Sequence, residues 1–172
     1  FDACAAAALL LWVAAPQRPI TAILCLAAGA LHAWRLARWG GYRTAAEPLV
    51  LILHIGYAFV PLGFVAAGCA LLSPAALPMS AALHVWTAGA IGTMTLAMMT
   101  RASLGHVGRP LHATPGIVFI YACVIAAAGL RIAAAIDPAP QILLHLAAAA
   151  WILAFAGFTI LFGPLLVRPR HR

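Results

Sequence analysis

Charged side chains are scarce in this 172-residue sequence. Only 8% of the residues are charged, just three are carboxylates, and every one of the ten basic residues is arginine. A water-soluble domain carries about 25% charged residues, so the few present here cannot cover a surface that faces water. This scarcity excludes a soluble globular domain. Because no carboxylate stands in the middle of an apolar segment, it also argues against hydrolytic chemistry.

The common catalytic and redox motifs are missing as well. The sequence contains no G-x-S-x-G, no phosphate-binding glycine loop, no C-x-x-C and no C-x-x-C-H. Ser103 and His106 are three residues apart, but they lack the third partner of a catalytic triad. The cysteines stand singly in separate apolar segments, so we interpret them as small core residues and not as a disulfide framework. They are Cys4, Cys25, Cys69 and Cys123.

Long apolar segments dominate what is present. The chain is 66% hydrophobic and its mean hydropathy is +1.06. A helix needs about 20 apolar residues to cross a bilayer, and several segments reach that length without the alternation that membrane β-strands show. The sequence therefore predicts an all-α, polytopic transmembrane helix bundle with about six spans. They lie at about 1–15, 19–38, 48–72, 80–100, 114–136 and 138–167.

Turn and capping residues set these boundaries. Gly40-Gly41 closes the second segment, and Glu47-Pro48 opens the third because proline fits a first helical turn. Within the third segment, Pro61 is expected to bend the helix. Small residues at close spacing in the fourth segment, such as Gly89 and Gly92, predict close helix contacts. The predicted N-caps of the last three segments are Ser80, Thr114 and Asp137.

The arginines predict the orientation of the chain. Alternating spans place Arg18 and Arg131 on one side of the membrane. The other eight lie on the opposite side, at positions 35, 38, 43, 101, 109, 168, 170 and 172. Since positive charge gathers on the cytoplasmic side, we expect a cytoplasmic C-terminus and attribute the net charge to membrane orientation, with no nucleic-acid partner. The start at Phe1, inside an apolar stretch and without a signal peptide, predicts a fragment that lacks its N-terminal part.

Histidines are numerous for so apolar a chain, which has seven. Ionisable residues within spans suggest a functional site, and neutral imidazole is a good ligand for haem iron and copper. His32 and His54 fall near the cytoplasmic ends of their spans, His106 in the following cytoplasmic loop, and His84 near the opposite side. These four are the candidate metal ligands. Alternatively, a histidine within a span bridges two helices by a hydrogen bond.

Two further patterns support a bound group. One helix face carries His84, Ala88, Ile91, Thr95 and Met98, where the small side chains leave room for a flat macrocycle below the imidazole. The predicted loop at residues 100–111 carries two arginines, Arg101 and Arg109, whose forked donors suit haem propionates or another anion. The alternative interpretation of this loop is a polar turn with positive-inside arginines.

A family resemblance rests on several of these stretches. The run from Ala90 to Leu111, with His84 before it, resembles the signature of the NnrS family. The resemblance extends to residues 32–36, 53–57 and 168–170. It implies a bacterial inner-membrane protein with about twelve spans, of which this chain is the C-terminal half. It also implies haem and copper cofactors, and a part in nitric oxide metabolism and resistance to nitrosative stress. No catalytic residue is assigned by it.

Two other functions fit the residues. The intramembrane histidines suit a metal-free transporter or proton pathway, because imidazole titrates near physiological pH. They also suit a structural subunit in which they only bridge helices.

Overall fold

The structure is a computed structural model that describes residues 1–137, 139 and 141–167. Helices make up nearly all of this part of the chain, which contains no strand, so the predicted all-α fold is confirmed. The elements are α1 (Asp2–Ala14), α2 (Pro19–Arg38), the 3-10 turn η1 (Gly41–Thr44), α3 (Pro48–Leu72), α4 (Met79–His84), the π-helix η2 (Val85–Gly92), α5 (Thr93–His106), α6 (Pro115–Ile136) and α7 (Gln141–Val167).

Five of the helices are long and apolar enough to cross a membrane. They are α2, α3, the continuous helix formed by α4, η2 and α5, α6, and α7. Helix α1 is also apolar, but its 13 residues fall short of the roughly 20 that a span needs. The chain is therefore a multi-pass membrane protein, with a shorter first helix where the sequence predicts the first of about six spans.

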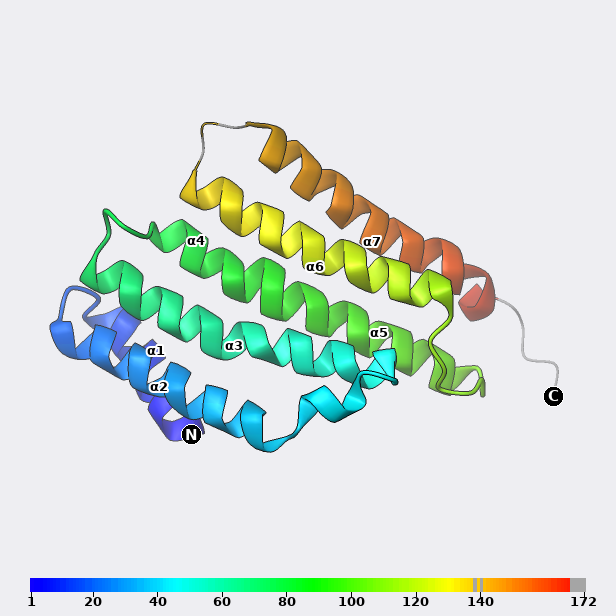
Figure 1. The fold of residues 1–172 in the computed structure, drawn as a ribbon, viewed down its shortest axis with the longest axis horizontal. Coiled ribbons are helices and arrows are strands. Elements are labelled where there is room, and N and C mark those ends of the chain that lie inside the picture. Colours follow the sequence, from blue (N-terminus) through cyan, green and yellow to red (C-terminus); the bar gives the residue numbers. More distant parts are fainter. Residues whose placement is uncertain (138, 140, 168–172) are drawn as a thin grey trace.

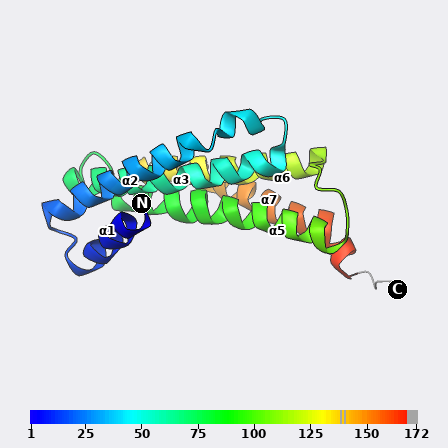
Figure 2. The ribbon, with the colours of Figure 1, turned by 90° about the horizontal axis from the view of Figure 1, so that it is seen from below.

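The long helices lie side by side in the order of the chain (Figure 1). Helix α3 packs between α2 and the α4–η2–α5 helix, while α7 packs mainly against α6. Helix α1 contacts α2 and lies below it when the molecule is turned (Figure 2). We call the end that carries Arg38, Arg43, Arg101 and Arg109 the arginine-rich end, and the end with Arg18 and Arg131 the opposite end.

Several helix boundaries agree with the sequence, whereas others need correction. Helices α2 and α3 begin and end where predicted, and the Thr114 hydroxyl accepts a hydrogen bond from the Ile117 amide at 3.4 Å as an N-cap. Ser80 does not cap a helix, because α4 begins at Met79. Asp137 ends α6 and accepts a bond from the Ala139 amide at 3.2 Å, and α7 begins only at Gln141.

The fourth helix is longer than predicted. It continues through Arg101 and His106, so His106 lies in the last turn of α5 and not in a loop. The helix stops where Gly108 adopts a left-handed conformation with φ 67°, which allows the Arg109 amide to bond to the Leu104 carbonyl at 3.0 Å. Polar residues in this stretch do not break a helix, whereas a left-handed glycine does.

Close packing between α3 and its neighbours depends on glycines that face bulky side chains. A Cβ atom at Gly63 would lie 2.2 Å from Nε1 of Trp86, and one at Gly56 would lie 2.8 Å from the Met94 sulfur. The Trp86 indole donates a hydrogen bond to the Val60 carbonyl at 3.2 Å, next to Pro61, and packs edge-on against Phe64. Trp86 is thus fixed in position on the surface of α3.

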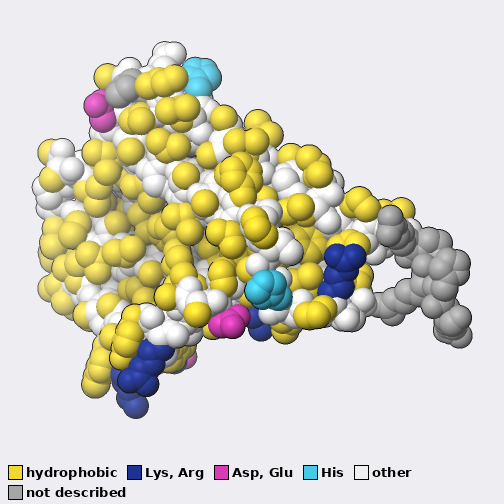
Figure 3. All heavy atoms as spheres, turned by 45° about the vertical axis from the view of Figure 1, so that its right-hand side comes forward, with side chains coloured by type: hydrophobic (Ala, Val, Ile, Leu, Met, Phe, Trp, Pro, Cys, Tyr) yellow, Lys and Arg dark blue, Asp and Glu magenta, His cyan; other side chains and the backbone are white. Residues whose placement is uncertain are grey.

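Apolar side chains also cover the outside of the molecule. In Figure 3 hydrophobic residues occupy most of the visible face, and arginines lie toward its lower and right-hand edges. The exposed residues include Ile23 at 56%, Ile160 at 74% and Val167 at 83%. A large exposed apolar surface marks contact with an apolar environment, here the lipid bilayer.

The glycine contact on α3 generates a stability prediction. We expect Gly63→Ala to lower the free energy of unfolding by about 1–3 kcal/mol, because the fixed Trp86 ring leaves no space for a methyl group. The matched control is Gly129→Ala in α6, where no atom lies within 4 Å of the added Cβ. Thermal unfolding in detergent measures both. Equal melting temperatures for the two variants would contradict this packing.

Candidate haem and metal-binding region

His32 lies on α2 and is buried, with only 5% of its side chain exposed. Its Nδ1 atom lies 2.7 Å from the Tyr57 hydroxyl on α3, within hydrogen-bond distance. Its ring stacks on Phe64 with centroids 5.8 Å apart. The second ring nitrogen, Nε2, is buried without a partner among the described residues. A buried polar atom without a partner is costly, so this nitrogen is suited to a ligand.

Tyr57 connects His32 to the second candidate histidine. The Tyr57 ring packs against Trp39 at a centroid distance of 4.6 Å, and Trp39 packs edge-on against His54 at 6.1 Å. Nδ1 of His54 lies 3.1 Å from the Val50 carbonyl one turn earlier on α3. The structure therefore places His32 and His54 in one aromatic cluster between α2 and α3, whereas the sequence predicts only that their depths match.

His84 lies at the other end of the molecule, beside a cavity of about 680 Å³. The cavity runs between the α4–η2–α5 helix, α6 and α7. Of the face that the helical spacing predicts, Ala88, Ile91 and Thr95 line the cavity together with His84, whereas Met98 does not. The charged residue on its wall is Arg131, and the other lining residues are Thr87, Gly92, Ala127, Leu144, Ala147, Ala148, Trp151, Ile152 and Phe155.

Local backbone structure shapes the wall of this cavity. The segment after His84 is a π-helix, a rare form that often occurs near functional sites. At its end, a Cβ atom on Gly92 would lie 2.7 Å from the Trp151 ring, so the glycine lets the indole approach the helix. Trp151 and Phe155 then pack together with centroids 4.7 Å apart. The result is a mainly apolar cavity with an aromatic wall and a histidine at one end.

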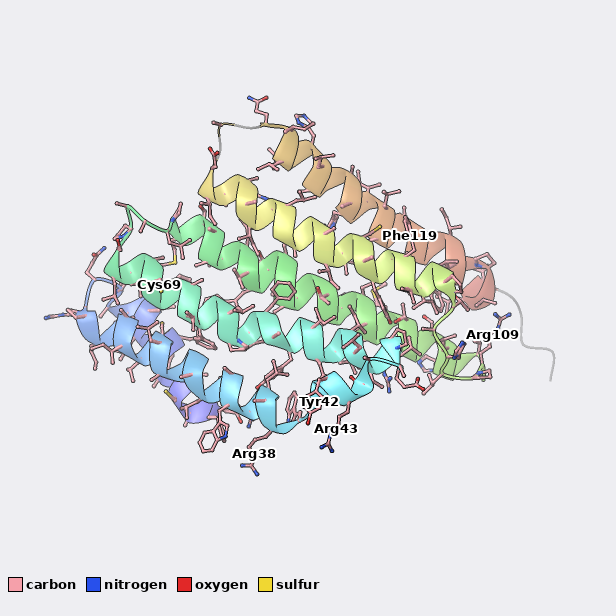
Figure 4. All side chains as sticks on the ribbon, viewed as in Figure 1. Arg38, Tyr42, Arg43, Cys69, Arg109 and Phe119 are labelled. Atoms are coloured by element: carbon pink, nitrogen blue, oxygen red, sulfur yellow. The ribbon has the colours of Figure 1, made fainter. Side chains whose placement is uncertain are left out.

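The remaining predicted site residues lie at the arginine-rich end. Arg101 donates to the Leu49 carbonyl at 3.4 Å, and His106 closes α5. Arg38 and Arg43 project outward beside the α2–α3 connection, and Arg109 lies beside the α5–α6 connection (Figure 4). None of these residues lines the His84 cavity.

The candidate histidines are not assembled into one site. Among the described residues, no three histidine, cysteine or acidic side chains lie close enough to hold a metal ion together. Two further cavity residues, Arg131 and Trp151, are not among the site residues that the sequence predicts. A signal for Arg131 was available, because it interrupts a segment that is otherwise apolar from Ala126 to Ile136.

The comparison with protein families decides the affiliation. The model of the NnrS family, described as NnrS protein, matches residues 2–170. This chain belongs to the NnrS family. No curated protein and no solved structure matches it. The family match covers both the aromatic cluster and the His84 cavity, so both belong to the part of the chain that the NnrS model describes.

The bond between His32 and Tyr57 generates a prediction for this NnrS-family chain. We expect Tyr57→Phe to lower the free energy of unfolding by about 1–3 kcal/mol, because it removes the partner of a buried imidazole nitrogen. The control is Tyr42→Phe, since Tyr42 is 75% exposed. Melting curves in detergent compare the two variants. Identical curves would show that the bond contributes nothing to stability.

Proposed function

We propose that this chain is a haem- and copper-binding protein of the bacterial inner membrane that acts in nitric oxide metabolism and resistance to nitrosative stress. Membership of the NnrS family motivates the proposal. The observation that carries it is the cavity beside His84, which places an imidazole at one end of a space large enough for a cofactor.

The residues around the cavity fit a haem group. Cofactor sites are clefts of about 300–1,000 Å³ with mainly apolar walls and a few placed polar groups, and the cavity of about 680 Å³ meets this description. His84 supplies an imidazole for the iron. Trp151 and Phe155 offer aromatic surfaces to a flat ring, and Ala88 and Ala148 leave room beside it.

Bound haem would supply an iron centre that can take up a diatomic gas. The contribution of the chain is to hold and shield it. His84 would hold the iron, while the apolar side chains of Ile91, Leu144 and Phe155 would lie against the ring. A small uncharged molecule such as nitric oxide reaches such a place readily through lipid, because it needs no polar pathway.

Copper has a different candidate residue. His32 presents a buried Nε2 atom without a partner, while its Nδ1 atom is held by Tyr57. Metal-ligating histidines commonly have the second nitrogen fixed in this way. His32 alone cannot form a copper site, and the described residues contain no cluster of three possible ligands. We therefore propose that other parts of the protein complete a copper site.

The arginine-rich end supplies the remaining candidates. His54 and His106 stay proposed metal ligands at this end, with Arg101 and Arg109 as proposed partners of an anionic group. Eight of ten arginines fall on this side of the predicted spans, which supports its assignment to the cytoplasm together with the C-terminus.

We further propose that a second helical half covers part of this chain. The resemblance to the family implies about twelve spans, which is about twice the number predicted here. The cavity wall supports this, since Trp151 is 37% exposed and Ile152 is 63% exposed although both line the cavity. A covering half would close the cavity and provide the missing metal ligands.

The test of the proposed function is spectroscopic. We expect the purified protein in detergent to show a Soret band that shifts on reduction, and metal analysis to find iron and copper. His84→Ala should abolish or shift the Soret band, because it removes the imidazole beside the cavity. The matched control is His145→Ala, at the same end of the molecule but exposed and outside the cavity lining.

Two results would reject the proposal. One is a full-length wild-type protein that contains neither haem nor copper after purification. The other is a Soret band that His84→Ala and His32→Ala both leave unchanged. A metal-free protein with pH-dependent flux in liposomes would instead favour a proton pathway through the histidines.

A further inference from the structure

Arg131 is the one charged side chain on the wall of the cavity. It lies on α6, one turn after Ala127 on the same face, and is half-buried. His84 lines the same cavity, and both residues lie near the ends of their helices at the opposite end of the molecule. The rest of the cavity wall is lined mainly by apolar side chains. The cavity is therefore amphipathic, with a cation and an imidazole at one end and hydrocarbon elsewhere.

Among the residues that the structure describes, no side-chain carboxylate forms an ion pair with Arg131. The sequence has three acidic residues, and the structure describes all of them. Asp2 forms an ion pair with Arg35 at 2.8 Å, and Glu47 precedes α3 at the arginine-rich end. Asp137 accepts a hydrogen bond from the Ala139 amide and makes no ion pair with Arg131.

An anion from outside the chain would compensate the charge of this half-buried arginine. A guanidinium within a membrane-spanning helix is costly unless it is paired or faces a polar cavity. Its planar fork binds carboxylates or phosphates through two parallel hydrogen bonds. Because the rest of the wall is apolar, the anion must belong to a molecule with an apolar body.

We infer that Arg131 binds a carboxylate of the porphyrin that occupies the cavity, while His84 faces its metal. This inference rests on the proposed function and assigns to Arg131 the role that the sequence suggested for Arg101 and Arg109. Those two arginines lie at the arginine-rich end and do not line the cavity. Arg131 is thus a binding residue that orients the ring, with its carboxylate edge toward the opposite end of the molecule.

The experiment compares metal-free protoporphyrin IX with its dimethyl ester, which has the same ring but no carboxylates. Binding is followed by quenching of tryptophan fluorescence, since Trp151 lies in the wall. We expect wild type to bind the free acid about tenfold more tightly than the ester. Arg131→Gln should remove this preference and leave ester binding unchanged, which also shows that the cavity is intact. Arg131→Lys should retain part of the preference.

Matched controls separate Arg131 from other effects. Arg18→Gln removes the other arginine at the same end, and Arg38→Gln removes an exposed arginine at the arginine-rich end. Both should keep the wild-type preference.

Three results would overturn the inference, each in a different way. If Arg131→Gln keeps the preference, Arg131 does not bind the carboxylate, although the proposed function stands. If wild type binds neither porphyrin, the proposed haem site fails and the inference fails with it. If native mass spectrometry finds phosphatidylglycerol bound through Arg131 and no porphyrin preference exists, the anion is a lipid phosphate.

Discussion

Close contact between glycines and bulky side chains on α3 is the interaction on which the arrangement of the helices depends. Lipid is as apolar as the helix surfaces, so association in a membrane relies on van der Waals packing and a few hydrogen bonds. Gly63 receives Trp86, Gly56 receives Met94, and Gly89 receives Phe59 of α3. On the other side, Val65 of α3 lies against Gly29 of α2. Each glycine provides a depression for one large neighbour, which fixes the register of three helices at once.

The same packing leaves space at only one side of the fourth helix. Its face toward α3 is filled, whereas the face toward α7 carries Ala88, Ile91, Gly92 and Thr95 beside the small Ala147 and Ala148. These small side chains leave a cavity beside the helix, and the aromatic side chains of Trp151 and Phe155 form part of its wall. The π-helical turn in η2 lies at this place. The close packing against α3 and the cavity beside α7 therefore both follow from where small and large residues lie along the fourth helix.

Sequence reasoning located the helices better than the site. Paired glycines follow the end of α2 and a proline opens α3, and the approximate bounds predicted for both helices agree with the structure. The end of α5 was missed because Arg101 and His106 are polar yet helix-compatible, and the deciding signal is the left-handed Gly108. The cavity face of His84 followed from helical spacing. The pairing of this face with Arg131 and Trp151 did not, since it depends on how α6 and α7 pack, which no local pattern encodes.

The two ends of the molecule use arginine for different purposes. At the arginine-rich end, Arg38, Arg43 and Arg109 project outward, where water and lipid headgroups solvate them at little cost. Arg131 instead faces an apolar cavity, and no acidic residue of the chain compensates its charge. Replacing it with an apolar residue would remove that cost, so stability alone does not account for an arginine at this position. A charge that the fold leaves uncompensated is best explained by a partner that the fold is built to bind.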